Sequence, residues 1–177
     1  MSAEEFMKQQ YLTLRDEIRS SKARVFFILV IGTLFVPFVA FAAKAYASTF
    51  ASASLPFIML VLMIAFIMEQ NSIVRAGKYL KDHVEPTLQG HPTWETWLEA
   101  NAKMREVDKS FFASFLIVFL VFYAASAGLA FEALLEQLRD GDGFPNQQWF
   151  ALGGYLVGGF WFLVVWLSHW RMCTTTN

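Results

Sequence analysis

The chain has 177 residues, of which 56% are hydrophobic and 17% aromatic, and its formal net charge at pH 7 is −1. The mean hydropathy is +0.41, which argues against a water-soluble helical protein, because helices on a soluble surface need a polar face. The near-neutral charge argues against a nucleic-acid-binding protein, which needs a strongly basic surface. The single cysteine excludes an intrachain disulfide.

The first predicted element is an N-terminal helix over residues 1–24. Met7, Tyr11, Leu14 and Ile18 are spaced by four, three and four residues, which places them in one apolar stripe on a helix. We expect this helix to continue into the apolar stretch that follows and to pack its stripe against other helices outside the membrane. The alternative is a helix that lies flat on the bilayer surface.

Four long apolar stretches follow, and none contains a charged residue. A helix needs roughly 20 residues to cross a hydrocarbon core about 30 Å thick, and its backbone must satisfy its own hydrogen bonds in lipid. We therefore predict four transmembrane helices, over residues 25–47, 51–70, 111–131 and 148–169. Their apolar cores are Val25–Ala43, Leu55–Met68, Phe111–Phe131 and Trp149–Ser168.

The segment between the second and third stretches is predicted to be a helical hairpin over residues 69–110. Ile73, Leu80 and Val84 continue the helical stripe of the second stretch, and Pro86–Pro92 contains two prolines and a glycine that break a helix. After this turn, Trp94 and Trp97 give the resumed helix a bulky apolar face. We predict that these two tryptophans are interaction residues, which pack against another part of the chain, a second copy or a partner protein.

Sidedness follows from the basic residues. Twelve of the 14 lysines and arginines fall in residues 1–24, between the second and third stretches, or after the fourth. Positively charged segments stay in the cytoplasm, so we expect both termini and the hairpin to be cytoplasmic and Lys44–Ser54 and Glu132–Gln148 to be external connections. The predicted fold is one all-α integral membrane domain over residues 1–177, in a bacterial inner membrane.

Small residues in the fourth stretch predict close helix packing. Gly154 and Gly158 form a GxxxG pattern, and Ala124 and Gly128 offer a matching small face on the third stretch. Such faces allow two helix backbones to approach closely. They can pack within one bundle or between subunits, and the sequence leaves both possibilities open.

Pro37 interrupts the first stretch. Its ring removes a backbone hydrogen bond to the carbonyl of Thr33 and is expected to bend the helix. A bent helix with an exposed carbonyl can line a pore, although it is more often a packing device.

Glu69, Gln70 and Asn71 are the polar residues at the cytoplasmic end of the second stretch. An ionisable residue near a membrane span is costly unless it is paired or hydrated. We expect Glu69 to form an ion pair; several copies could instead form an acidic ring at a cation-selective pore. The candidate partners are Arg24, Arg105 and Lys109.

No catalytic or cofactor motif is present, and the histidines lack the spacing typical of metal ligands. We therefore expect a non-enzymatic protein without cofactor or metal, which self-associates and acts as a membrane sensor or effector through its cytoplasmic helices. The layout resembles small bacterial four-span proteins of sensing, defence or channel systems. The alternative is a homo-oligomeric ion channel subunit. The expected partners are the lipid bilayer, further copies of the chain and a cytoplasmic protein, but no nucleic acid.

Overall fold

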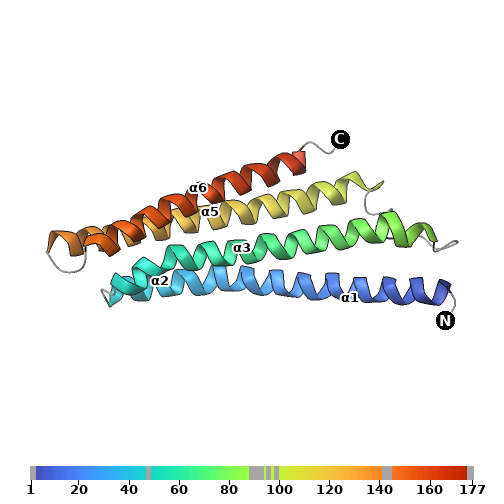
Figure 1. Cartoon of the computed structure of the whole chain (residues 1–177), viewed down its shortest axis with the longest axis horizontal. Helices are drawn as coiled ribbons and strands as arrows, with labels where there is room; N and C mark the ends of the chain where they lie inside the picture. The colour runs from blue at the N-terminus through green and yellow to red at the C-terminus, as the bar shows by residue number, and fades with distance from the viewer. Residues whose placement is uncertain are drawn as a thin grey trace. The chain divides into compact units, whose positions relative to one another are not determined.

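The computed structural model describes residues 3–46, 49–87, 94, 97, 100–140 and 145–174. Within these ranges, side chains are not described for residues 3–4, 102–109, 145–147, 166 and 169–174. All regular secondary structure among the described residues is helical (Figure 1). The long elements are α1 (Ala3–Val30), α2 (Val36–Ala45), α3 (Thr49–Tyr79), α5 (Ala102–Arg139) and α6 (Pro145–Thr174).

The first helical run confirms the expectation that the N-terminal helix continues into the first apolar stretch. A π-helical turn, Ile31–Phe35, joins α1 to α2 without an intervening loop. The amide of Val36 donates to the carbonyl of Ile31, five residues earlier. The wide turn ends next to Pro37, which has no amide hydrogen to give to an ordinary α-helical bond. The helical run therefore continues through Pro37, and the irregularity is a π-helical turn just before it.

The second helical run extends far beyond its apolar stretch. α3 is followed directly by a π-helical turn, Leu80–Val84, and a 3₁₀ turn, Glu85–Thr87. The Thr87 hydroxyl donates a 2.7 Å hydrogen bond to the carbonyl of Val84 in the last turn. The run ends at the start of the predicted Pro86–Pro92 turn, most of which lies outside the described residues.

The connections between the helices are shorter than the charge pattern predicted. The predicted connection Lys44–Ser54 is reduced to the few residues between Ala45 and Thr49, and Glu132–Gln148 to those between Arg139 and Pro145. Helices do not have to end where hydrophobicity ends, because Ala, Leu, Glu, Gln and Arg all favour helix.

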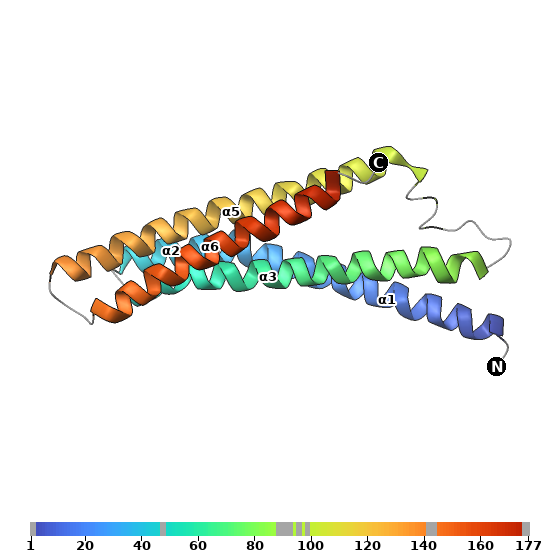
Figure 2. The same ribbon diagram turned by 45° about the horizontal axis from the view of Figure 1, so that its top comes forward.

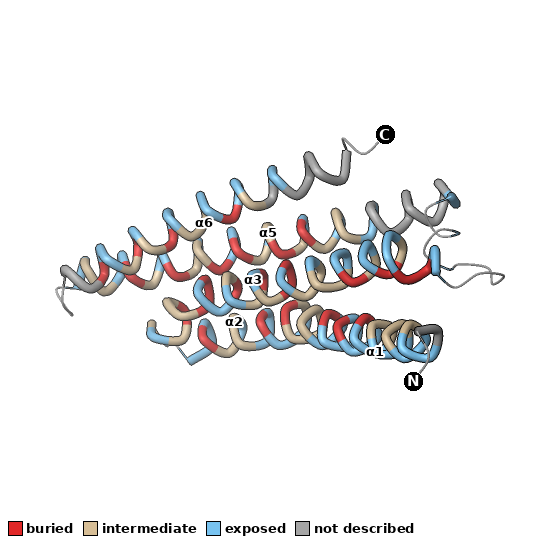
Figure 3. The backbone as a smooth tube through the Cα atoms, turned by 45° about the vertical axis from the view of Figure 1, so that its right-hand side comes forward, coloured by how far each residue is buried: buried red, intermediate tan, exposed pale blue. Residues whose placement is uncertain are grey.

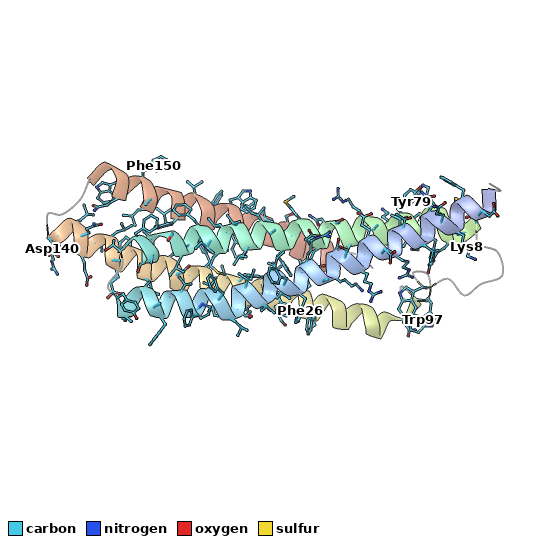
Figure 4. All side chains as sticks on the ribbon, turned by 90° about the horizontal axis from the view of Figure 1, so that it is seen from below. Lys8, Phe26, Tyr79, Trp97, Asp140 and Phe150 are labelled. Atoms are coloured by element: carbon cyan, nitrogen blue, oxygen red, sulfur yellow. The ribbon has the colours of Figure 1, made fainter. Side chains whose placement is uncertain are left out.

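Four described segments are long and apolar enough to cross a membrane. They are Glu5–Ala45, Thr49–Thr87, Ser110–Arg139 and Gln148–Val165. Each contains all or most of one predicted transmembrane segment. Many large apolar side chains on these helices are exposed, and Phe26 and Phe150, labelled in Figure 4, are 69% and 86% exposed. Such outward-facing apolar surface is what a helix in contact with lipid presents.

The chain divides into two compact units. The first unit comprises Met1–Leu29 and Ala65–Phe111, and the second comprises Val30–Ile64 and Phe112–Asn177. In the second unit α5 runs alongside α6 (Figure 2), and buried residues recur along one side of each helix (Figure 3). A buried cluster of this unit joins α5 to α6 and consists of Ala130, Leu134, Leu152 and Tyr155.

Candidate functional site

The first unit has an apolar core of its own. Ile18 on α1 is buried against Ala76, Leu80 and Val84. Around them pack the partly buried side chains of Tyr11, Leu14 and Ile73. This confirms that the N-terminal stripe packs against the stripe that follows the second apolar stretch. Tyr11, Leu14 and Ile18 of the stripe therefore pack within the chain, whereas Met7 is not part of this cluster.

An ion pair joins α1 to α3 at the edge of the two apolar stretches. The Arg24 guanidinium donates from Nε to Oε1 of Glu69 over 2.7 Å and from Nη2 to Oε2 over 2.9 Å. The same guanidinium donates to the hydroxyls of Ser20 and Ser21, over 2.8 and 2.9 Å. Of the three predicted partners of Glu69, the structure thus brings Arg24 to it, whereas the side chains of Arg105 and Lys109 lie outside the described residues.

The other polar residues of this segment are placed differently. Gln70 is half-buried and Asn71 is exposed. The carbonyl of Asn71 accepts a 3.3 Å hydrogen bond from Nε of Arg75, one turn further along α3. Glu69 is the residue of the three that forms the ion pair between α3 and α1 described above.

Trp94 and Trp97 form an aromatic pair in the first unit. Their ring centroids are 5.3 Å apart at an interplanar angle of 32°, and the side chains are 51% and 46% exposed. The amide of Asn101 donates to the carbonyl of Trp97, which is a helical hydrogen bond. The Arg15 guanidinium lies 5.8 Å from the Trp94 ring centroid and 5.3 Å from that of Tyr11. Both distances are typical of cation–π contacts, so Arg15 connects the tryptophan pair to the stripe of α1. Figure 4 labels Trp97 of this pair and Tyr79, the last residue of α3.

Gly154 and Gly158 of α6 pack against α3. A Cβ atom at Gly154 would lie 3.2 Å from the Phe57 ring, and one at Gly158 would overlap the Leu60 side chain. At the next residue, a Cβ at Gly159 would lie 3.2 Å from the ring of Tyr123 on α5. The absence of side chains at these positions is therefore what allows α6 to approach the other helices.

The predicted small face of α5 does not face these glycines. Ala124 and Gly128 are exposed, and a Cβ built at Gly128 would have no atom within 4 Å among the described residues. The structure thus separates the two pairs that the sequence matched: Gly154 and Gly158 are used within the chain, and Ala124 and Gly128 remain on the surface of the second unit.

The irregular turn near Pro37 is packed by a glycine. Gly32 is buried, and a Cβ there would lie only 2.7 Å from the ring of Phe119 on α5. Thr33 is half-buried, whereas Pro37 is exposed. Single π-turns inside α-helices are frequent at functional sites. Here the missing side chain of Gly32 lets Phe119 of α5 pack closely against the turn.

Two tyrosines tie three helices together in the second unit. The Tyr123 hydroxyl on α5 donates to the carbonyl of Tyr155 on α6, and the Tyr155 hydroxyl donates to the carbonyl of Ala53 on α3. Ser126 in turn donates to the carbonyl of Tyr123 over 2.9 Å. Neither tyrosine was singled out from the sequence. Their signal is a polar tip within an otherwise apolar stretch, which needs a partner when buried.

No family model, curated protein or solved structure matches the chain. Among the described residues, no group of three or more His, Cys, Asp or Glu side chains is placed to hold a metal ion.

Proposed function

We propose that the chain is a non-enzymatic integral membrane protein that self-associates and acts as a sensor or effector through the helices of the first unit. The observation that carries this proposal is the buried core of that unit, formed around Ile18 and Leu80 from residues outside the apolar stretches. Helices that only anchor a protein in lipid need no second apolar core beyond the bilayer. A folded helical unit attached directly to membrane helices can transmit a change of packing in either direction.

The exposed tryptophan pair supports a partner-binding role for this unit. Trp94 and Trp97 are about half exposed, and Arg15 holds the first of them from one side. Tryptophan and arginine are enriched among the residues that dominate binding energy at protein interfaces. The proposed partner is a cytoplasmic protein. The cytoplasmic placement follows the excess of basic residues on this side of the predicted spans, and a bacterial inner membrane is the proposed location.

The surface of the second unit supports self-association. Ala124 and Gly128 are exposed on α5, with open space where a Cβ of Gly128 would stand. Small exposed residues four positions apart let a second helix approach closely in lipid, where packing and not the hydrophobic effect drives association.

The ion-channel alternative has weaker support. The features that suggest a channel are Pro37, Thr33 and Ser126 within the apolar stretches and, separately, an acidic ring of Glu69 residues from several copies. Both oxygens of the Glu69 carboxylate accept hydrogen bonds from Arg24, so this group is already compensated by a cation within the same chain. The pair accounts for Glu69 within one chain, without a ring of carboxylates from several copies.

The test is the mass of the intact protein in a mild detergent. We expect a mass of two or more chains, which falls to one chain when Ala124→Leu and Gly128→Leu are combined. Val61→Leu, at an exposed position of α3, is the matched control and should leave the mass unchanged. A monomer from the unmodified chain at all concentrations would reject self-association. Current across a planar bilayer that changes with Glu69→Gln would favour the channel instead.

A further inference from the structure

A groove lies beside the Arg24–Glu69 ion pair. It has a volume of about 420 Å³ and is shallow and largely open to the outside. One part of its lining is polar and the rest is apolar. The lining residues are Ser20, Ala23, Arg24, Phe27, Ile28 and Glu69.

The polar part of the groove presents a fixed cation beside a fixed anion. Arg24 is held by Glu69, Ser20 and Ser21 through the four hydrogen bonds described above. A guanidinium has five N–H donors, and the four bonds to described residues use four of them. One N–H on Nη1 and the Ser20 hydroxyl can therefore donate to a ligand. Arg24 and Glu69 are 51% and 22% exposed at their side chains. Both charges are therefore oriented by the protein and still reachable from outside.

The groove lies where the chain changes from charged to apolar. Arg24 is the last charged residue before the stretch Val25–Ala43, and Glu69 is the first after Leu55–Met68. Phe27 and Ile28 extend the groove towards the apolar side, and Phe27 is largely exposed. If the apolar stretches cross the bilayer, this position is the level of the lipid headgroups, where basic pockets between helices bind them.

We propose that this groove binds the headgroup of a phospholipid that carries both a phosphate and a primary ammonium, such as phosphatidylethanolamine. The phosphate accepts hydrogen bonds from Arg24 and Ser20, the ammonium donates to Glu69, and the first part of an acyl chain lies over Phe27 and Ile28. The inference rests on the membrane insertion proposed above, but not on self-association.

The pairing of charges in the groove selects among headgroups. An anionic lipid without an amine leaves Glu69 facing a second negative charge, which is unfavourable. A trimethylammonium headgroup keeps the positive charge but has no N–H to donate to the carboxylate. Only a headgroup with a primary ammonium complements both Arg24 and Glu69 through hydrogen bonds to charged groups, which are the stronger kind.

The test is lipid retention by the intact, delipidated protein, measured as bound-lipid mass in native mass spectrometry. Dioleoyl phosphatidylethanolamine, phosphatidylcholine and phosphatidylglycerol are added in separate titrations. We expect the ethanolamine lipid to bind about tenfold more tightly than the choline lipid, which corresponds to the loss of one hydrogen bond to a charged group. Equal binding of the three lipids by the unmodified chain would overturn the proposal without any variant.

Soluble phosphoethanolamine, added as a competitor, separates a lipid site from a site for a free phosphate. We expect it to compete weakly, because it lacks the chain that contacts Phe27 and Ile28. Competition as strong as that of the lipid would show that the groove takes a soluble ligand and would overturn the assignment to a lipid.

Variants test whether the preference for the ethanolamine lipid arises in the groove. Glu69→Gln should abolish the preference for the ethanolamine lipid over the choline lipid, and Arg24→Gln should weaken binding of both. Arg19→Gln, at an exposed position of α1, and Glu132→Gln, at an exposed position of α5, are the matched controls. Preference that survives Glu69→Gln in a folded protein would overturn the proposal. Subunit mass from the same spectra reports self-association separately, and carbonate extraction of membranes reports insertion.

Discussion

The hydroxyl of Tyr123 donates a hydrogen bond to the backbone carbonyl of Tyr155, on the next helix of the chain. Tyr155 also links α6 to a third helix, because its own hydroxyl donates to the carbonyl of Ala53 on α3. In a bundle without a strong hydrophobic force between helices, hydrogen bonds between side chains and backbone help to fix which helices are neighbours. These two bonds therefore define the order α5, α6, α3 in the second unit.

Removal of the Tyr155 hydroxyl should loosen this connection while keeping the ring. In Tyr155→Phe the aromatic contact with Phe57, whose ring centroid is 5.0 Å away, is preserved. We expect a loss of about 0.6 kcal/mol in the free energy of unfolding, and at most about 1.7 kcal/mol, the range measured for hydrogen bonds between membrane helices. Thermal unfolding in detergent measures it. Tyr46→Phe, at an exposed position, should have no effect, and equal losses in both variants would contradict the role of the Tyr155 bond.

Gly32 should not tolerate a side chain. In Gly32→Ala the new methyl group would lie 2.7 Å from Cε1 of Phe119, and Phe119 is a buried ring with little room to move. Overpacking of this kind costs about 1–3 kcal/mol, against a gain in helix propensity of about 1 kcal/mol when alanine replaces glycine. Because the Phe119 ring is buried and the approach is close, we expect a cost in the upper part of this range. We expect a lower melting temperature in detergent.

Gly128→Ala is the control for this substitution, because nothing lies within 4 Å of its new Cβ among the described residues. Gly128→Ala should leave the melting temperature of the monomeric protein unchanged or raise it. A Gly32→Ala protein as stable as the Gly128→Ala protein would show that the π-turn relaxes without cost.

The helical architecture was predictable from simple physical rules. Apolar stretches long enough to cross a bilayer locate the helices, and the spacing of Tyr11, Leu14 and Ile18 identifies the face of α1 that becomes buried. The sequence limited the candidate partners of Glu69 to three basic residues, and the structure pairs it with one of them, Arg24. These features depend on local sequence period and on charge, both of which a single sequence contains.

The partners of the small faces were not predictable in the same way. Gly154 and Gly158 contact Phe57 and Leu60 on α3, whereas the sequence suggested α5 as a match. A GxxxG pattern shows that something approaches closely but carries no information about which helix does so. The same holds for the tyrosine bonds, whose acceptors are backbone carbonyls that every residue possesses. Such pairings depend on the arrangement of the helices in three dimensions.

The core of the first unit should be sensitive to a cavity. Leu80 is fully buried between α1 and the end of the α3 run, and truncation of a buried leucine to alanine costs about 2–5 kcal/mol. We expect Leu80→Ala to increase amide hydrogen exchange in α1 before Ser21 and in residues 73–87. Leu12→Ala, at an exposed position of α1, should leave this exchange unchanged. Uniform loosening of both units would argue against an independent core in the first.

The Arg24–Glu69 pair should behave as a coupled unit at the apolar boundary. Arg24→Glu alone places two carboxylates where a cation and an anion were 2.7 Å apart, and Glu69→Arg alone places two guanidinium groups there. Each single variant should lower the melting temperature in detergent, because like charges at this distance repel. The combined exchange restores opposite charges and should recover most of the loss, which a double-mutant cycle measures as a coupling energy. Since both side chains are partly exposed, added salt should shrink that coupling. If the double variant instead loses as much melting temperature as the two single variants together, the two residues are not coupled. The contact between α1 and α3 would then not depend on this pair.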